Sequence, residues 1–248
     1  MAPKDEIVPI LKKLRLSGFL ATLDLRVKEA VDEDLSHGEF LFRLLSDEIA
    51  RRDGKQLDVR LRRATFEGQK RLEDFEWGFN PGIPRARIID LATCAFVEKH
   101  ENVLLVGPTG VGKSHVAQAL GERACRAGFG VLYTPAHRML TALRASRADQ
   151  SYEKRLLRYT SPDLLILDDV GLRPLEGQEP IDLYEVIRAR YERGAMVLTS
   201  NRAVEEWYPL FRDELMASAA MDRLLHRAHV VVMEGHSFRN PPAARRAS

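Results

Sequence analysis

The segment VLLVGPTGVGKSHVAQALGERA, residues 103–124, joins an apolar run to a helical pattern through a glycine-rich loop. The loop itself, GPTGVGKS, matches the pattern G-x-x-x-x-G-K-[ST] at every fixed position. Glycines let such a loop curl so that its backbone N–H groups point at phosphate oxygens, and the following helix N-terminus adds partial positive charge. The segment therefore predicts a phosphate site at the end of a strand, in an α/β protein.

The side chains of this loop have separable expected roles. The ammonium group of Lys113 would reach the β- and γ-phosphates of a nucleotide, and the Ser114 hydroxyl would bind Mg²⁺. We expect nucleotide binding by the whole loop, which consists of Gly107, Pro108, Thr109, Gly110, Val111, Gly112, Lys113 and Ser114.

Further apolar runs alternate with helical patterns after residue 91. The predicted strands are residues 103–107, 131–134, 164–169, 196–201 and 229–234. Strands that are separated by helices of this length pair in parallel, with the helices covering the sheet. The fold class that we predict is a parallel five-stranded sheet flanked by helices, preceded by a small all-helical domain.

Two of these strands end in polar side chains of the kind that nucleotide hydrolysis needs. LLILDD, residues 164–169, ends in Asp168, which would hold Mg²⁺ through water, and Asp169, which would orient or deprotonate the attacking water. MVLTSN, residues 196–201, ends in Asn201, whose amide can both donate and accept and so sense the γ-phosphate. Either ending could be a simple turn, but the combination with the glycine-rich loop favours hydrolysis over binding alone.

The chain divides into three parts that differ in sequence pattern and composition. Residues 1–70 show only helical spacing and form the expected N-terminal domain, which binds a partner or DNA. Residues 71–90, rich in aromatics, glycine and proline, are interpreted as an extended connector. Residues 91–248 form the expected ATPase domain. Ser36 and Glu39 predict a capping box at the start of a helix in the first part.

Composition excludes several classes of protein. The net charge of +2 is nearly neutral, so any affinity for nucleic acid must come from local clusters. The two cysteines, Cys94 and Cys125, lack metal-ligand spacing and are interpreted as reduced, buried thiols. The N-terminus is too charged for a signal peptide, and no apolar run is long enough to span a membrane. We expect a cytoplasmic protein with no membrane partner.

The assembled motifs resemble the IstB-like and DnaC-like group of AAA+ ATPases. Nearly the whole chain takes part in the resemblance, which rests on EFLFRLLSDEIARRD, FNPGIPRARIIDLAT, NVLLVGPTGVGKSHVAQALG, LLILDDVG, TSNRAVEEW and MDRLLHRAHVVVMEGHSFR. It implies ATP and Mg²⁺ as cofactors and a homo-oligomer, ring or helical, with ATP sites between subunits. It further implies double-stranded DNA and a cognate transposase of the IstA type as partners in DNA transposition.

The resemblance also assigns two arginines. Arg223 lies on the polar side of an amphipathic helix, and it is similar in place to the arginine finger that reaches a neighbouring subunit's γ-phosphate. Arg227 is the second candidate for that role, and a plain surface arginine remains the alternative. Arg239 matches a second arginine sensor that acts on the same subunit's nucleotide. Asp169 departs from the Asp-Glu pair of many AAA+ proteins, although this group often has Asp-Asp there.

Basic clusters are the candidate DNA contacts. Between residues 138 and 158 a surplus of basic residues would face the central channel of a ring, as the resemblance implies, and bind phosphates without reading sequence. The candidates are Arg138, Arg144, Arg147, Lys154 and Arg155, with Arg188 and Arg190 on a later helix. Residues 51–71 carry another basic surplus. Solvated helix surfaces are the alternative for each cluster.

Three competing functions remain at this stage. A DnaC-like helicase loader would act on single-stranded DNA and a replicative helicase. A small-molecule kinase would need an acceptor pocket with a lid, and a binding module that does not hydrolyse its nucleotide would not need Asp168, Asp169 and Asn201.

Overall fold

The computed structural model describes residues 4–211 and 213–240, and it contains the predicted five-stranded sheet. All strand pairs are parallel, in the order β2-β3-β4-β1-β5. The strands are β1 (Val103–Val106), β2 (Val131–Pro135), β3 (Leu164–Asp168), β4 (Ala195–Ser200) and β5 (His229–Val232). The predicted fold class is confirmed, and each strand begins within one residue of its expected start.

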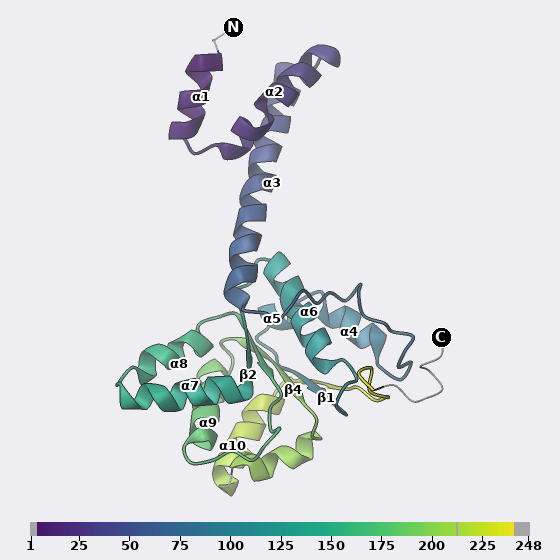
Figure 1. The fold of residues 1–248 in the computed structure, drawn as a ribbon, viewed down its shortest axis with the longest axis vertical. Coiled ribbons are helices and arrows are strands. Elements are labelled where there is room, and N and C mark those ends of the chain that lie inside the picture. The colour runs from purple at the N-terminus through teal and green to yellow at the C-terminus, as the bar shows by residue number, and fades with distance from the viewer. Residues whose placement is uncertain (1–3, 212, 241–248) are drawn as a thin grey trace. The chain divides into compact units, whose positions relative to one another are not determined.

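The sheet is buried because helices cover both of its faces (Figure 1). Helix α6 (Lys113–Arg126) contacts four of the strands from one side. Alternate strand residues such as Leu104, Leu165 and Leu198 point to the other side, into one large apolar core. That core is completed by α7 (Ala136–Ala148), α8 (Tyr152–Thr160), α9 (Glu179–Arg190), α10 (Glu214–Leu225) and the 3₁₀ helix η1 (Val204–Phe211).

The chain separates into two compact units, residues 1–59 and 60–248. The first unit contains α1 (Lys4–Lys13), α2 (Ser17–Asp32) and most of α3 (His37–Ala64). The boundary between the units follows Val59 and so lies before the expected limit at residue 70. Helix α3 crosses this boundary, and the residues after Val59 pack with the second unit. At the start of α3, Ser36 Oγ accepts from the Glu39 amide at 3.2 Å, which is half of the predicted capping box.

Residues 71–90 are not the extended connector that the sequence suggested. Backbone hydrogen bonds close successive turns here, for example from Phe75 N to Leu72 O at 3.3 Å and from Phe79 N to Glu76 O at 3.1 Å. Two short helices follow, α4 (Arg85–Leu91) and α5 (Ala95–Glu98). Proline and glycine mark turns as well as extended chain. Here the ring of Phe75 packs against Trp77 in the same segment and against His115 of α6, and these contacts hold the turns in place.

Arg190 is a structural residue and not a DNA contact as its position in a basic cluster suggested. Its side chain is 1% exposed at the end of α9. The guanidinium donates to four backbone carbonyls at 2.7–3.1 Å, those of Tyr159, Pro162, Asp163 and Ala195. It thus joins the end of α8, the loop before β3 and the start of β4.

We therefore expect Arg190→Met to lower the free energy of unfolding by about 3 kcal/mol or more, because several buried carbonyls lose their donors. Urea denaturation followed by circular dichroism measures this effect. Arg188→Met is the matched control, since Arg188 is exposed on the same helix and pairs with the nearby Glu185, and its change should stay within about 0.5 kcal/mol. Equal losses for the two variants would contradict the structural role.

Two predictions about cysteines and membranes can be compared with the described residues. Cys94 and Cys125 are both free and buried, as expected. Within residues 4–211 and 213–240, none of the helices has the length and apolar character that a membrane span needs.

Candidate nucleotide site

A cavity of about 690 Å³ lies at the carboxyl edge of the sheet, where the predicted site residues come together. The glycine-rich loop forms one wall, and the ends of β3 and β4 contribute Asp168, Asp169 and Asn201. Lys113, Ser114 and Arg239 also line it. Parallel strands bring their carboxyl ends to one edge, and such edges are where open α/β sheets bind ligands.

The loop adopts a conformation that only glycine accepts at two points. Gly112 has φ +103° as the N-cap of α6, and a Cβ atom there would lie 2.6 Å from the Phe75 ring. Gly110 has φ +86°, and a Cβ atom there would lie 2.1 Å from Ser237 Oγ. Substitution at either position would both strain the backbone and force the neighbouring segment away.

Lys113 is placed inside this loop. Its side chain is buried, and Nζ donates to the carbonyls of Gly107 and Pro108 at 2.7 Å. Burial lowers the pKa of Lys113, and the carboxylates of Asp169 and Asp168 partly oppose that shift. An ammonium group in such a setting is short of negative partners, so phosphate oxygens would bind it strongly.

The two carboxylates at the end of β3 have different environments. Asp168 is buried and accepts from the Tyr133 hydroxyl at 2.8 Å and from the Thr199 hydroxyl. Asp169 has φ +57°, a left-handed conformation that is uncommon outside glycine, and its amide donates to Thr199 Oγ1 at 2.9 Å. This turn sends the exposed Asp169 side chain into the cavity and away from the strand.

The pKa of Asp169 is raised, first by partial removal from water and then by the nearby Asp168 carboxylate. A raised pKa makes a carboxylate a better proton acceptor when it is ionised, which suits a group that activates water. The pair thus consists of Asp168, a carboxylate that accepts two side-chain hydrogen bonds, and Asp169, whose pKa is raised.

The donor set fits Mg²⁺ bound together with a nucleotide. Mg²⁺ prefers oxygen ligands and usually keeps several waters, with one or two protein ligands plus phosphates. The Ser114 hydroxyl and the Asp168 carboxylate line the same cavity. Among the described residues, no cluster of three or more His, Cys, Asp or Glu side chains could hold a metal alone. A site of this kind would need the phosphates to complete it.

The apolar part of the cavity was not found from the sequence. It is lined by Phe75, Phe79, Ile83 and Phe238, and the rings of Phe79 and Phe238 meet edge to face at 5.0 Å. Asn80 fixes the segment before Phe238, since its side-chain amide exchanges two hydrogen bonds of 2.9 Å with the His236 backbone. Apolar and aromatic walls of this kind suit a nucleobase. The aromatic residues of 71–90 were the available signal.

Arg239 belongs to the same C-terminal segment as His236 and Phe238, and this segment brings it to the nucleotide cavity. The Phe238 amide donates to the Gly110 carbonyl at 2.9 Å, which holds the segment on the phosphate loop. Arg239 lines the cavity, and its charge acts on both Lys113 and Asp169. It is thus placed beside its own subunit's phosphate site.

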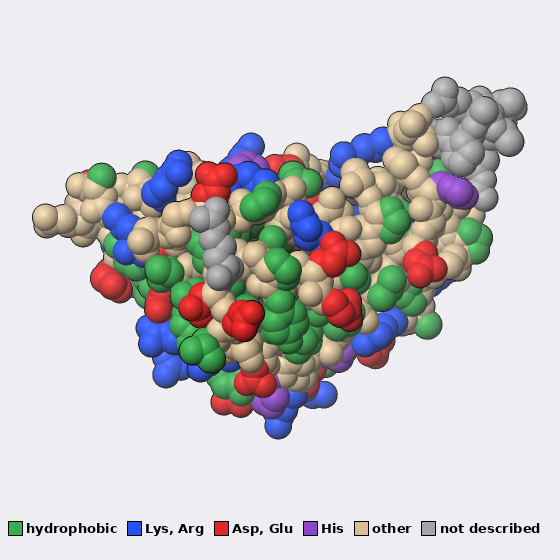
Figure 2. Space-filling view, turned by 90° about the horizontal axis from the view of Figure 1, so that it is seen from below, with side chains coloured by type: hydrophobic (Ala, Val, Ile, Leu, Met, Phe, Trp, Pro, Cys, Tyr) green, Lys and Arg blue, Asp and Glu red, His purple; other side chains and the backbone are tan. Residues whose placement is uncertain are grey.

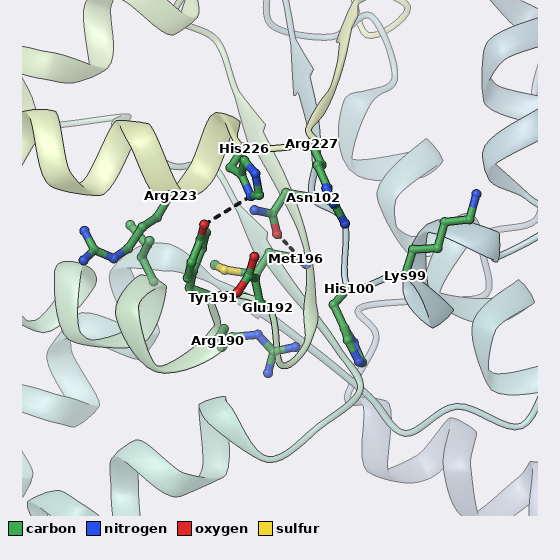
Figure 3. A pocket seen from close by; sticks show the side chains of 11 residues that line it. Lys99, His100, Asn102, Arg190, Tyr191, Glu192, Met196, Arg223, His226 and Arg227 are labelled. Atoms are coloured by element: carbon green, nitrogen blue, oxygen red, sulfur yellow. Dashed lines mark hydrogen bonds between the residues drawn. The ribbon is translucent and has the colours of Figure 1, made fainter.

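Arg223 lies elsewhere, at the amino edge of the sheet. It lines a second cavity of about 210 Å³, together with residues such as Asn102 and Met196 next to the starts of β1 and β4 (Figure 3). Its guanidinium donates to the Ala219 carbonyl at 2.7 Å and lies 5.7 Å from the centre of the Tyr184 ring. Arg223 and the nucleotide cavity thus occupy opposite edges of one sheet.

The surroundings of Arg223 are strongly basic. The cavity is also lined by Lys99, His100, His226 and Arg227, with Glu192 as its acidic side chain. Figure 3 shows Arg223 extending from α10 on the opposite side of this cavity from Lys99 and His100. A concentration of positive charge here would attract a negatively charged group of another molecule.

The candidate DNA contacts fall into two groups. Arg138, Arg144, Lys154, Arg155 and Arg188 lie on α7, α8 and α9, exposed or half-buried. Arg147, in contrast, is paired with buried Asp182 and lies 4.0 Å from the centre of the Tyr152 ring, so it supports the packing of α7, α8 and α9. On the face seen in Figure 2, Lys and Arg side chains are interspersed with Asp and Glu.

Comparison with known proteins identifies what this arrangement resembles. A family model described as IstB-like ATP binding protein matches residues 9–245. An insertion-sequence ATP-binding protein of Mycobacterium tuberculosis is 45% identical over 92% of each chain. An IS21 ATP-binding protein of Pseudomonas aeruginosa is 35% identical over 94% of this chain and 88% of its own. The crystal structure of DnaI superimposes with a TM-score of 0.57 at 21% identity, over 67% of this chain and 92% of that one. The fold is that of P-loop AAA+ proteins.

Proposed function

This chain belongs to the family of IstB-like ATP-binding proteins, and from that premise we propose that it is an ATPase that assists an insertion-sequence transposase. One observation supports hydrolysis above all others. The glycine-rich loop, Asp168, Asp169 and Asn201 share one cavity, although the sequence separates them widely.

Each side chain has a task in that reaction. Lys113 would exchange its carbonyl partners for the β- and γ-phosphates, and Ser114 and Asp168 would hold Mg²⁺. Bound Mg²⁺ supplies charge neutralisation at the phosphates. Asp169 orients the attacking water and accepts its proton, while Asn201 binds the γ-phosphate or the water. The apolar end with Phe79 and Phe238 accommodates the adenine.

The position of Arg223 supports an active site that is shared between subunits. Arg223 and the nucleotide cavity of its own subunit lie at opposite edges of the sheet, so the arginine would serve the nucleotide cavity of a neighbouring copy. Head-to-tail contacts of this type generate rings or helical filaments. Arg239 provides the second positive charge from within the same subunit.

The assembly in turn provides a surface for duplex DNA. Repetition of α7 along a ring or filament presents Arg138 and Arg144 many times, so that individually weak phosphate contacts add up. The transposase then recognises the protein–DNA assembly, and hydrolysis releases it. Insertion-sequence relatives that cover over 90% of this chain support a transposition partner over a replicative helicase.

Mass photometry with ATP or ADP and with duplex or single-stranded DNA tests this proposal. We expect particles much larger than one 28.1 kDa chain only when ATP and duplex DNA are both present. Assembly that prefers single-stranded DNA would favour the helicase-loader alternative. Turnover that depends on a small acceptor would favour a kinase, and ATP hydrolysis by a persistent monomer would exclude the shared site.

A further inference from the structure

Thr199 carries a buried hydroxyl near the end of β4, after four apolar residues of the strand. Its exposed fraction is 0%. A strand that helices cover on both faces usually contains apolar residues, and a buried hydroxyl costs free energy unless it forms hydrogen bonds. The hydrogen-bond partners of this hydroxyl therefore indicate why the strand contains a threonine here.

The partners of the Thr199 hydroxyl are the two acidic residues at the end of β3. Leu167 pairs with Leu198 in the sheet, so the next residues of the two strands, Asp168 and Thr199, lie side by side. Thr199 Oγ1 donates to Asp168 Oδ1 and accepts from the Asp169 amide at 2.9 Å. One hydroxyl thus joins the carboxylate of the first acidic residue to the backbone of the second.

The backbone of Asp169 needs support of this kind. Its φ of +57° lies in the left-handed region, which residues other than glycine adopt only where the surroundings hold them. The two peptide groups that flank its Cα atom both bind Thr199. Asp169 N donates to the hydroxyl, and Val170 N donates to the Thr199 carbonyl at 2.8 Å. Thr199 therefore holds both peptide planes, and with them the direction of the Asp169 Cα–Cβ bond into the cavity.

Loss of the Thr199 hydroxyl would affect Asp169 more than Asp168. Asp168 is buried, and it keeps the Tyr133 hydroxyl as a donor at 2.8 Å. The side chain of Asp169 is exposed, so burial does not hold its carboxylate in place. The direction of that carboxylate depends on the backbone conformation, which the two bonds to Thr199 stabilise.

Other side chains of the segment after Thr199 hold the remainder of the loop. Ser200 Oγ donates to the Val170 carbonyl at 2.7 Å, and Arg202 Nε donates to the Gly171 carbonyl at 2.6 Å. These bonds do not involve the Thr199 hydroxyl. Removal of that hydroxyl should therefore change the direction of one carboxylate and leave the rest of the loop in place.

We propose that Thr199 is a positioning residue that holds Asp169 in its left-handed conformation and so directs the carboxylate at the attacking water. The inference rests on the proposed ATP hydrolysis, and it goes beyond the sequence, which had assigned a role only to Asn201 in this strand. Thr199 is fully buried and acts through Asp169, without contact to the water or the nucleotide.

Thr199→Val tests this role, because valine keeps the shape of the side chain and removes the hydroxyl. In the full-length protein assembled with ATP and duplex DNA, kcat should fall about tenfold to a hundredfold, since small displacements of a reacting group cost that much. The KM for ATP and the dissociation constant of magnesium AMPPCP should change by less than about threefold, because ground-state binding is intact. Thr199→Ser keeps the hydroxyl and should restore kcat to near the wild-type value.

Hydrogen–deuterium exchange of residues 168–171 provides a readout that needs no turnover. Exchange should be faster in Thr199→Val than in the wild type or Thr199→Ser, because the Asp169 amide has lost its acceptor. Ser146→Ala is the matched control, since it removes another buried hydroxyl, which donates to the Leu143 carbonyl in α7 at 2.7 Å. This control should leave kcat and the exchange of residues 168–171 at the wild-type level.

Combination with Asp169→Asn shows through which carboxylate Thr199 acts. Adding Thr199→Val to Asp169→Asn should lower kcat little further, since both changes affect the same carboxylate. Losses that multiply would contradict the proposal. So would a higher Mg²⁺ requirement for AMPPCP binding by Thr199→Val alone, because the hydroxyl would then act through Asp168.

The remaining outcomes distinguish this inference from the function on which it rests. A wild-type protein that does not hydrolyse ATP, or an Asp169→Asn variant with full turnover, would overturn the proposed function. Wild-type kcat in Thr199→Val, or a Thr199→Ser protein as slow as Thr199→Val, would overturn the positioning role alone. If urea denaturation shows that Thr199→Val does not fold, Thr199→Ala removes the same hydroxyl and is judged by the same results.

Discussion

Replacing Arg223 by alanine is expected to lower ATP turnover in the assembled protein by about a thousandfold. The guanidinium would no longer neutralise charge that develops on the γ-phosphate of the neighbouring subunit. ATP affinity should change little, because no atom of the subunit's own nucleotide cavity is altered. Steady-state phosphate release and the binding of a fluorescent ATP analogue measure the two quantities.

Arg227→Ala is the matched control, since Arg227 lines the same basic cavity and is the second candidate for the finger. If Arg227→Ala causes the larger loss of ATP turnover, Arg227 is the arginine finger and Arg223 is not. If neither variant affects turnover while assembly is intact, this edge of the sheet does not complete an active site.

Replacing Asp169 by asparagine is expected to lower turnover by about a hundredfold to ten-thousandfold, because the group that accepts the proton of the attacking water is lost. ATP-dependent assembly should persist, since Lys113 and the loop backbone still bind the phosphates. Phosphate release and mass photometry check these two expectations. Asp90→Asn, a change of the same chemistry at an exposed position of α4, should leave both at the wild-type level.

The two variants together test whether the site is shared. Mixing Arg223→Ala with Asp169→Asn creates interfaces in which an intact Arg223 faces an intact Asp169 from the other variant. Turnover should then recover to well above that of either variant alone. A mixture as inactive as its components, although the particles contain both variants, would mean that Arg223 acts within its own subunit or outside catalysis.

The phosphate end of the site could be predicted because its determinants are local. A glycine-rich loop, a lysine and a helix start lie next to one another in the chain, and their chemistry requires little else. The strand ends with Asp168 and Asn201 could be added because parallel strands bring their carboxyl ends to one edge. The apolar part of the cavity could not be predicted, since Phe75 and Phe238 come together only when two segments far apart in the sequence pack against the glycine-rich loop.

Basic residues are a clearer case in which the sequence alone could not predict the role of a side chain. Arg188 and Arg190 are two positions apart on α9, yet one is exposed and the other is buried among backbone carbonyls. A cluster of charges in the sequence does not distinguish Arg188 from Arg190. Which of them faces solvent depends on how α9 packs on α8 and β4, and this packing is determined by apolar contacts far along the chain.

The sequence by itself determined the α/β fold, the glycine-rich loop and the residues that we assign to water and Mg²⁺, because strand periodicity and loop chemistry are properties of neighbouring residues. Only the tertiary structure decided that Glu67 joins the cavity, that Arg190 and Arg147 serve packing, and that Arg223 lies at the opposite edge of the sheet. These facts depend on which distant segments come into contact, and such contacts form only when the whole core assembles.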